Sequence, residues 1–324
     1  MKAAVYRRYG PPDVVRIEEV EKPVPGNDEI LVRVRAASVN PLDWHFMRGS
    51  PYFLRFGAGL RGPKDIRLGV DVAGEVEAVG RSVARLAPGD AVFGTCRGAF
   101  AEYACAPESK IVVKPANVTF EQAACAGVAG FTALQGVRDK AGVQPGQKVL
   151  VNGAAGGVGT FAVQIAKAFG AEVTGVCSTR NVELVRSIGA ARVVDYTRED
   201  FTRGEQRFDL IYDVVANHSL SACRRVLNPT GMYLVAGVGP GGSILAFLAR
   251  GIVMLPLSML VGQRLVLLMA RATQEALTAL SELMAAGKVT PVVDRRYPLS
   301  EVPEAIRYVE EGHARGKVVI TLDS

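Results

Sequence analysis

A glycine-rich loop between an apolar run and a helical pattern constrains this chain more than any other feature. Residues 149–159 read VLVNGAAGGVG. Gly156 and Gly159 keep the last spacing of the dinucleotide fingerprint G-x-G-x-x-G, and Ala154 stands in place of its first glycine. Backbone amides and the positive end of the following helix can hold a pyrophosphate. We predict dinucleotide binding by Ala154, Gly156, Gly157, Val158 and Gly159, the alternative being a tight turn without a ligand.

Strand and helix patterns alternate around this loop, as far as residue 237. Apolar runs predict strands at Lys148–Val151, Glu172–Cys177, Val193–Asp195, Phe208–Val215 and Met232–Ala236, and amphipathic patterns predict helices at Gly159–Phe169 and Asn181–Ile188. Such alternation is typical of a parallel sheet with helices on both faces, which we therefore expect here.

The end of the second strand bears on which nucleotide the loop binds. An NAD site usually places an acid there, on the ribose 2′-hydroxyl. Here Cys177 is followed by Ser178, Thr179 and Arg180, and Tyr196 follows the third strand. Hydroxyls and a guanidinium can donate hydrogen bonds to a 2′-phosphate that an acid would repel. We therefore predict NADP(H), although Arg180 could be a solvated charge and Ser178 or Thr179 a helix cap.

The first part of the chain, residues 1–118, has a different texture. Short alternating strands between Gly and Pro turns predict a β-rich, barrel-like module, for example at Ile30–Ala36 and Ile111–Lys114. After residue 272 come short pieces that can return to this module: helices at Gln274–Ala286 and Pro303–Glu311 and a closing strand at Lys317–Leu322. We expect domain divisions at 1–118, 119–272 and 273–324.

The charge and the cysteines of the chain limit its possible binding partners and its cellular location. The chain holds 38 Lys plus Arg against 32 Asp plus Glu, a formal charge of +6, which can serve a phosphorylated cofactor. The basic residues are dispersed rather than gathered in a stripe with aromatics, so we expect no nucleic-acid partner. Five cysteines without C-x-x-C spacing and the absence of a visible secretory signal predict a cytoplasmic location.

Several motifs resemble the medium-chain dehydrogenase/reductase superfamily, in its zinc-independent quinone oxidoreductase branch. They are SVNPLDW at 38–44, LGVDVAGEV at 68–76, GDAVFG at 89–94, GFTAL at 130–134, the loop at 152–159 and GKVVI at 316–320. The resemblance implies an α/β fold with a GroES-like β-barrel domain and an inserted Rossmann domain, a doubly wound parallel sheet. It also implies NADPH-dependent reduction of quinones, enones or related carbonyl compounds, usually by homodimers.

Zinc separates the branches of this superfamily, because the alcohol dehydrogenase branch uses a Cys, a Gly-His-Glu and a four-cysteine lobe. This chain has Asn40 near the place of the Cys, GVD at 69–71 instead of Gly-His-Glu, and no clustered cysteines. A catalytic zinc needs three protein ligands from Cys, His or carboxylate. We therefore predict no zinc, and acceptors such as quinones, whose electron sink is built in.

The segment after Asn40 matches the substrate edge of the family. By position, Asn40, Asp43 and Tyr52 match pocket residues, and His45 falls where relatives carry a tyrosine. Asn40, His45 or Tyr52 could donate a hydrogen bond or proton to a developing oxyanion. The same residues also read as a helix start, with Asn40 as N-cap and Asp43 three residues on. Both readings stay open.

Further cofactor contacts are expected where the later strands end. Thr132 matches a family position near the nicotinamide ribose, unless it only bonds its own helix backbone. Val214 and Asn217 follow the fourth strand, and Gly237 and Val238 follow the next, at the edge where doubly wound sheets bind ligands.

The segment 243–262 is very apolar and departs from the plainest family members. Its uncharged run between Arg250 and Arg264 is shorter than the ~20 residues that span a bilayer. It could be a lid, a dimer contact, a patch on a membrane surface with Arg250, Arg264 and Arg271 near headgroups, or simply buried core. An edge strand at Gln263–Met269 would follow it, which in this family often pairs across a dimer.

We expect an NADPH-dependent oxidoreductase that acts on a small-molecule electron acceptor. The alternative is a non-enzymatic NADPH-binding protein, or one associated with a membrane surface, of the same fold, because no side chain here is uniquely catalytic.

Overall fold

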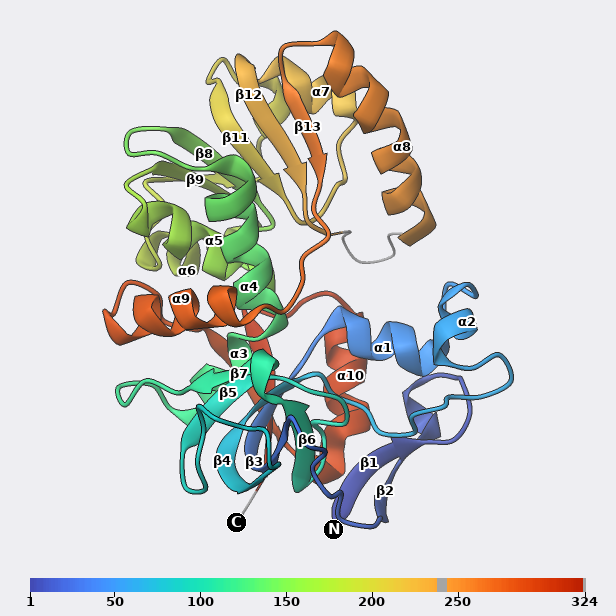
Figure 1. Cartoon of the computed structure of the whole chain (residues 1–324). Coiled ribbons are helices and arrows are strands. Elements are labelled where there is room, and N and C mark those ends of the chain that lie inside the picture. The colour runs from blue at the N-terminus through green and yellow to red at the C-terminus, as the bar shows by residue number, and fades with distance from the viewer. Residues whose placement is uncertain (238–243, 323–324) are drawn as a thin grey trace. The chain divides into compact units, whose positions relative to one another are not determined.

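The computed structural model describes residues 1–237 and 244–322, which form two compact units (Figure 1). The first unit comprises Met1–Phe131 and Ala272–Ser324, and the second comprises Thr132–Arg271. The second unit begins later than residue 119 because the helix α3 (Phe120–Cys125) packs against strands of the first unit, β3 (Glu29–Val39) and β4 (Asp71–Val79).

A seven-stranded sheet forms the centre of the first unit. Its order is β14-β15-β3-β4-β5-β7, and β6 also pairs with β3. The remaining strands are β5 (Ala91–Thr95), β6 (Tyr103–Pro107), β7 (Ile111–Val113), β14 (Val293–Pro298) and β15 (Lys317–Thr321), and β1 (Lys2–Tyr6) pairs with β2 (Val15–Glu19) beside them. The pairings are antiparallel except that of β14 with β15. The C-terminal strand β15 therefore lies inside the sheet, between β14 and β3.

Helices surround this sheet. They are α1 (Pro41–Arg48), α2 (Leu54–Ala58), α3, α9 (Gln274–Ala285) and α10 (Val302–Glu310), and α4 (Val128–Leu134) leads into the second unit. Of these, α3, α9 and α10 pack against its strands. The helix α10 buries Val302, Ala305 and Ile306 against a core that includes Val318 and Ile320 of β15. Spacing by three and four residues places all three on one face of α10, which is why that face is buried.

The second unit contains a six-stranded parallel sheet with the order β10-β9-β8-β11-β12-β13. Its strands are β8 (Lys148–Asn152), β9 (Glu172–Cys177), β10 (Arg192–Asp195), β11 (Phe208–Asp213), β12 (Leu227–Val235) and β13 (Arg264–Leu267). The α-helices between them are α5 (Gly157–Ala168), α6 (Val182–Ser187), α7 (Leu220–Arg225) and α8 (Ile244–Leu260). The predicted doubly wound fold is confirmed. The strand order reverses between β8 and β11, where such sheets bind ligands.

Short helical turns complete the two units. They are η1 (Pro12–Val14), η2 (Glu108–Lys110), η4 (Thr179–Asn181), η5 (Phe201–Arg203), η6 (Leu299–Glu301) and the π-helical η3 (Gln135–Ala141).

The apolar segment 243–262 forms α8, beside β13 (Figure 1), and Ser243 lies outside the described residues. Its inner side packs into the core through Met254, which is buried with Leu265. Simple core burial is wrong for the outer side, because Ile252 and Leu255 there are 74% and 70% exposed. Arg250 also points inwards, since its guanidinium donates to carbonyls of the loop after β11, so it does not reach the surface as expected.

No helix in the part of the chain that the structure describes is long and apolar enough to cross a bilayer.

Candidate functional site

The loop between β8 and α5 contains two glycines, Gly153 and Gly159, that no other residue can replace without strain. Gly153 has a φ of +85°, which favours glycine. A Cβ on Gly159 would lie 2.0 Å from the Gly153 carbonyl oxygen, so α5 can start against the loop only without a side chain there. Ala154, which replaces the first fingerprint glycine, is fully buried and fits because Gly175 of β9 lacks a side chain beside it.

Gly156 marks the open side of the same loop. It is the N-cap of α5, and a Cβ there would meet only the Gly153 carbonyl oxygen, at 3.6 Å. The space beside Gly156 is therefore clear of protein, at the positive end of a helix of 12 residues. This fits an anionic pyrophosphate, and Gly157 and Val158 begin the helix at that point.

A buried carboxylate organises the turn after β11. Asp213 Oδ1 accepts the Asn152 amide at 2.9 Å and the backbone N–H groups of Val215 and Ala216 at 3.0 and 2.8 Å. The Tyr233 hydroxyl donates to Asp213 Oδ2 at 2.8 Å. These bonds fix the backbone at the switch point, including Ala216, which has a positive φ of 56°.

Two of the predicted cofactor contacts border this turn. Asn217 Oδ1 accepts the second amide hydrogen of Asn152 at 3.0 Å, so β8 and the loop after β11 are joined side chain to side chain. Val214 follows β11 directly, against the Gly153 turn. Gly237 follows β12 in the same way, whereas Val238 lies outside the described residues.

The predicted phosphate-recognition residues meet at the ends of β9 and β10. The Tyr196 N–H donates to the Cys177 carbonyl at 3.0 Å, which brings Tyr196 beside Ser178. Thr179, Arg180 and Tyr196 are exposed there. Ser178 Oγ accepts the Asn181 amide at 3.3 Å, so its own hydrogen is directed elsewhere.

β10 ends at an acidic residue, Asp195, whereas β9 ends at Cys177. Asp195 therefore places a carboxylate beside the predicted phosphate-recognition residues. Thr179 Oγ1 donates to Asp195 Oδ2 at 2.6 Å, and the hydroxyl and N–H of Thr197 donate to Oδ1. These hydrogen bonds and the Arg198 guanidinium hold the pKa of Asp195 below its ordinary value. The Thr179 hydroxyl is thus directed to a carboxylate of the chain itself.

Thr132 lies in α4 at the start of the second unit and is buried. Its carbonyl accepts the Tyr212 hydroxyl at 2.9 Å, which anchors the helix to β11. Gly136 leaves room for the Tyr212 ring, because a Cβ at Gly136 would lie 2.3 Å from a ring carbon.

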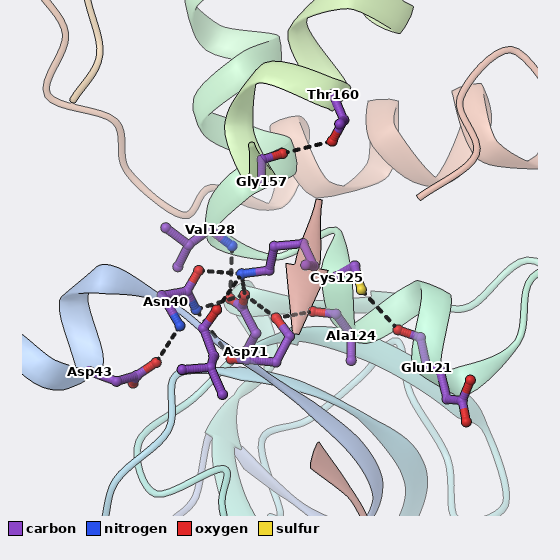
Figure 2. Close-up of polar contacts among 12 residues, drawn as sticks. Asn40, Asp43, Asp71, Glu121, Ala124, Cys125, Val128, Gly157 and Thr160 are labelled. Atoms are coloured by element: carbon purple, nitrogen blue, oxygen red, sulfur yellow. Dashed lines mark hydrogen bonds and ion pairs between the residues drawn. The ribbon is translucent and has the colours of Figure 1, made fainter. Parts of the chain in front are cut away.

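The first unit holds a buried polar network at the start of α1, shown in Figure 2. The Lys317 ammonium donates to Asn40 Oδ1 at 2.5 Å and to the Val39 carbonyl at 3.0 Å, and it lies 3.4 Å from Asp71 Oδ2. Asn40 Nδ2 donates to the same Asp71 oxygen at 2.9 Å, and the Ser38 hydroxyl lies 2.8 Å from it. Lys317 and Asp71 have 4% and 0% of their side chains exposed, so each needs the other as counter-ion.

The other oxygen of Asp71 fixes the turn between α3 and α4. The Val128 N–H donates to Asp71 Oδ1 at 2.8 Å (Figure 2). Gly127 permits this approach, because a Cβ there would lie 2.2 Å from Asp71 Oδ1.

Asp43 caps α1 from inside the protein. Its Oδ2 accepts the Asn40 N–H at 2.7 Å, as the predicted helix start requires. Burial, and then the nearby Asp71 charge, raise the pKa of Asp43 to about 7, although the Asn40 N–H and Lys317 oppose the shift. These contacts favour the structural reading of Asn40 and Asp43, since the Asn40 side chain is turned to Asp71 and Lys317.

His45 and Tyr52 both belong to the first unit, but His45 is buried and Tyr52 is exposed. His45 Nδ1 is 2.9 Å from the Ser50 carbonyl, which can only accept, so Nδ1 carries the hydrogen and Nε2 of the neutral ring is an acceptor. Burial lowers the pKa of His45, which favours that neutral form. Tyr52 is 75% exposed, and its ring contacts the Arg55 guanidinium.

Sequence reasoning missed four charged residues that organise these sites through hydrogen bonds and ion pairs. They are Asp71, Lys317, Asp195 and Asp213. All four stand at the first or last residue of a strand, and that position was the available signal. Asp71, Asp213 and Lys317 are also buried, which is unusual for charged residues. Their partners could not be read from the sequence, because Lys317 and Asn40 are 277 positions apart.

Two family models match the chain. The alcohol dehydrogenase GroES-like domain matches residues 26–116, and the zinc-binding dehydrogenase model matches residues 188–320. The 2-methylene-furan-3-one reductase of Solanum lycopersicum is 36% identical over 335 residues, with 99% of this chain and 79% of that protein aligned. The NADPH-dependent alkenal/one oxidoreductase of Arabidopsis thaliana is 34% identical, with the same two coverages.

A solved structure with a similar fold is the quinone oxidoreductase from Coxiella burnetii. Its TM-score is 0.86 at 30% sequence identity, covering 100% of this chain and 99% of that one.

Proposed function

Because the chain belongs to the medium-chain dehydrogenase/reductase superfamily, in its quinone oxidoreductase branch, we propose that it reduces a quinone, an enone or a related conjugated carbonyl compound with NADPH. The observation that carries this proposal is the open loop at Gly156, where a strand, a glycine turn and a helix start leave room for a pyrophosphate. NADPH, when bound, supplies a hydride from C4 of the nicotinamide.

The residues of the second unit fit such a dinucleotide. The N–H groups at the start of α5 would bind its pyrophosphate, and the turn that Asp213 holds would border the nicotinamide side. The preference for NADPH over NADH is supported by Ser178, Arg180 and Tyr196 at the ends of β9 and β10. Asp195 opposes this preference, because hydrogen bonds from Thr179 and Thr197 keep its carboxylate charged.

The residues at Asn40 and Asp71 do not fit a zinc ion. An amide, an aspartate and an ammonium meet there, and Lys317 supplies the positive charge that the aspartate needs. A zinc site requires Cys, His or carboxylate donors, and an ammonium is not a donor to a metal. We therefore propose a reaction without zinc, although one matching family model carries zinc in its description.

A reaction without zinc suits acceptors with conjugated carbonyl groups. A quinone or enone stabilises the developing negative charge in its own π-system, whereas an isolated ketone depends on a Lewis acid or strong donors. Asn40 uses both amide hydrogens within the chain, and His45 presents an acceptor at Nε2. We therefore propose Tyr52, whose side chain is exposed, as the proton donor among the three residues predicted.

The test is NADPH oxidation, followed by absorbance, with a panel of quinones, enones and saturated ketones. We expect turnover with the first two classes and none with the third. NADH in place of NADPH should raise KM, and Tyr52→Phe should lower kcat while NADPH affinity stays unchanged. Tight NADPH binding without oxidation of any acceptor would instead support the second hypothesis, a non-enzymatic NADPH-binding protein.

We also propose a homodimer in a reducing cytoplasm. The edge strand β13 supports the first part, because a second copy could pair with its outer side. The five free cysteines support the second, since none of them forms a disulfide in the structure as described. Light scattering and fractionation of cells test the two parts separately.

A further inference from the structure

The outer side of α8 is apolar where a surface helix is normally polar. Ile252, Leu255 and Met259 are 74%, 70% and 84% exposed, and their spacing of three and four residues places them on one stripe. Val253 and Leu260, at 59% and 83%, widen it. The opposite side of α8 packs against the core through Met254, so the exposed face has no packing role within the second unit.

The charge around α8 has one sign. Between Asp213 and Glu275 the sequence contains no aspartate or glutamate, but it contains five arginines. Arg225 and Arg271 among them are exposed, and the exposed Arg264 donates to the Lys140 carbonyl at 3.2 Å. An apolar helix face in a stretch of sequence whose only charged residues are arginines complements a surface that is apolar below and anionic above.

A polar cleft of about 420 Å³ opens just beyond the C-terminal end of α8. It is lined by Ser221, Arg224, Arg225, Pro229, Val261, Gly262 and Gln263. Arg224 Nε donates to Gln263 Oε1 at 2.9 Å, and Gln263 Nε2 donates back to the Arg224 carbonyl at 2.9 Å, so this wall is held in place. Two guanidinium groups in one cleft can bind a phosphate.

We propose that α8 docks on an anionic lipid bilayer, lying in the plane of the interface. In this arrangement Ile252, Leu255 and Met259 enter the acyl region, and Arg225, which lines the cleft beyond the end of α8, binds a lipid phosphate. A second copy of the chain fits the same face less well, because it would add arginines and no carboxylate from this region to pair with them. The proposal is independent of the reductase activity.

Flotation with lipid vesicles tests the docking. The full chain should float with phosphatidylcholine vesicles that contain phosphatidylglycerol, and high salt should weaken this binding. The double variant Ile252→Asp, Leu255→Asp should abolish flotation. Arg225→Gln should weaken partition roughly fivefold for anionic vesicles and change nothing for pure phosphatidylcholine.

Val24→Asp is the matched control, because Val24 is an apolar residue of the first unit that is 86% exposed. It should float as the unmodified protein does. NADPH affinity and thermal midpoint of each variant check the fold, and Ile252→Ser with Leu255→Ser replaces the aspartate pair if that pair fails this check.

Two results would overturn the proposal. One is a folded, NADPH-binding protein that does not float with anionic vesicles. The other is a dimer that the Ile252 and Leu255 substitutions dissociate, in a protein that binds no vesicles, which would assign the face to a second copy.

Discussion

Lys317 and Asp71 are a buried pair whose charges depend on each other. The surrounding hydrogen bonds from Asn40 and Ser38 end on the same carboxylate, so the pair also fixes the start of α1. Removing one partner leaves the other charged, without water and without a counter-ion.

Lys317→Met should therefore lower the free energy of unfolding by about 3–5 kcal/mol, measured by urea denaturation. The matched variant is the double substitution Lys317→Met, Asp71→Asn, which removes both charges. It should recover part of the loss, and a double variant no more stable than Lys317→Met would show that the pair is not electrostatically coupled.

The pH dependence of stability has a contribution from Asp43. Its pKa of about 7 in the folded protein lies above the ordinary 3.8, so the native state holds this proton more tightly than the unfolded chain does. Stability from this group is complete below about pH 4 and is lost as pH rises towards about 7. The charges that face it are Asp71 and Lys317.

Asp43→Asn removes this titration and keeps an oxygen that can accept the Asn40 N–H. We expect thermal midpoints of the variant to change less between about pH 5 and about pH 7 than those of the unmodified protein. Parallel curves for the two proteins would contradict the raised pKa of Asp43.

The open side of Gly156 makes a clean test of nucleotide binding. A Cβ at Gly156 would meet only the Gly153 carbonyl oxygen, at 3.6 Å, so Gly156→Val would add its side chain on the open side of the loop, at an extended backbone that valine tolerates. We expect NADPH to bind at least about tenfold more weakly, a loss of about 1.4 kcal/mol, with little change in thermal midpoint.

Gly204→Val is the control for this substitution. Gly204 is also extended, and a Cβ there would likewise meet only one carbonyl oxygen at 3.6 Å, that of Phe201. Equal NADPH affinities of the two variants would argue against a pyrophosphate at Gly156.

Single residues were predictable where their neighbours in sequence determine them. The Gly156 and Gly159 positions and the Asn40–Asp43 helix start follow from local patterns. The contacts of Asn40 with Asp71 and Lys317 depend on how the strands pair, which no local pattern encodes.

Among the elements, the loop after β11 depends most on one side chain. Asp213 accepts three N–H groups and a hydroxyl there, from Asn152 of β8, from the loop itself and from Tyr233 of β12. The Arg250 guanidinium of α8 adds hydrogen bonds to two carbonyls of the same loop.

Asp213→Leu should leave these donors buried without an acceptor, at a cost of more than about 2 kcal/mol in unfolding free energy, and should weaken NADPH binding. Asp213→Asn keeps one acceptor oxygen and should lose much less. Calorimetry with and without NADPH measures both effects, and two variants of equal stability would show that the hydrogen bonds do not hold the loop.

Strands and helices with regular apolar spacing were predictable from the sequence. The strands Glu172–Cys177 and the helix that begins at Gln274 match β9 and α9 closely. The helix α8 was harder, because a continuous apolar run does not say which of its sides faces the core.

For the molecule as a whole, the proposed reaction without zinc predicts the effect of a chelator. Lys317 is the cation beside Asp71, so a chelator would remove no ion from that position. NADPH oxidation should be unchanged after prolonged treatment with EDTA. Lost activity that zinc restores would contradict this reading.

The two-unit architecture was predictable, since barrel-like strands and alternating strand–helix patterns occupy different parts of the sequence. The position of the first boundary was not, because the composition of α3 resembles the Ala-rich helices that follow it, whereas its packing joins β3 and β4.

The position of β15 inside the sheet of the first unit sets an order of events during synthesis. β15 pairs with β3 and carries Lys317, so Asp71 waits for its counter-ion until more than two hundred further residues have left the ribosome. The second unit has all of its strands by Leu267. A nascent chain should therefore complete its nucleotide-binding unit first, while the unit that starts earlier in the sequence is finished last.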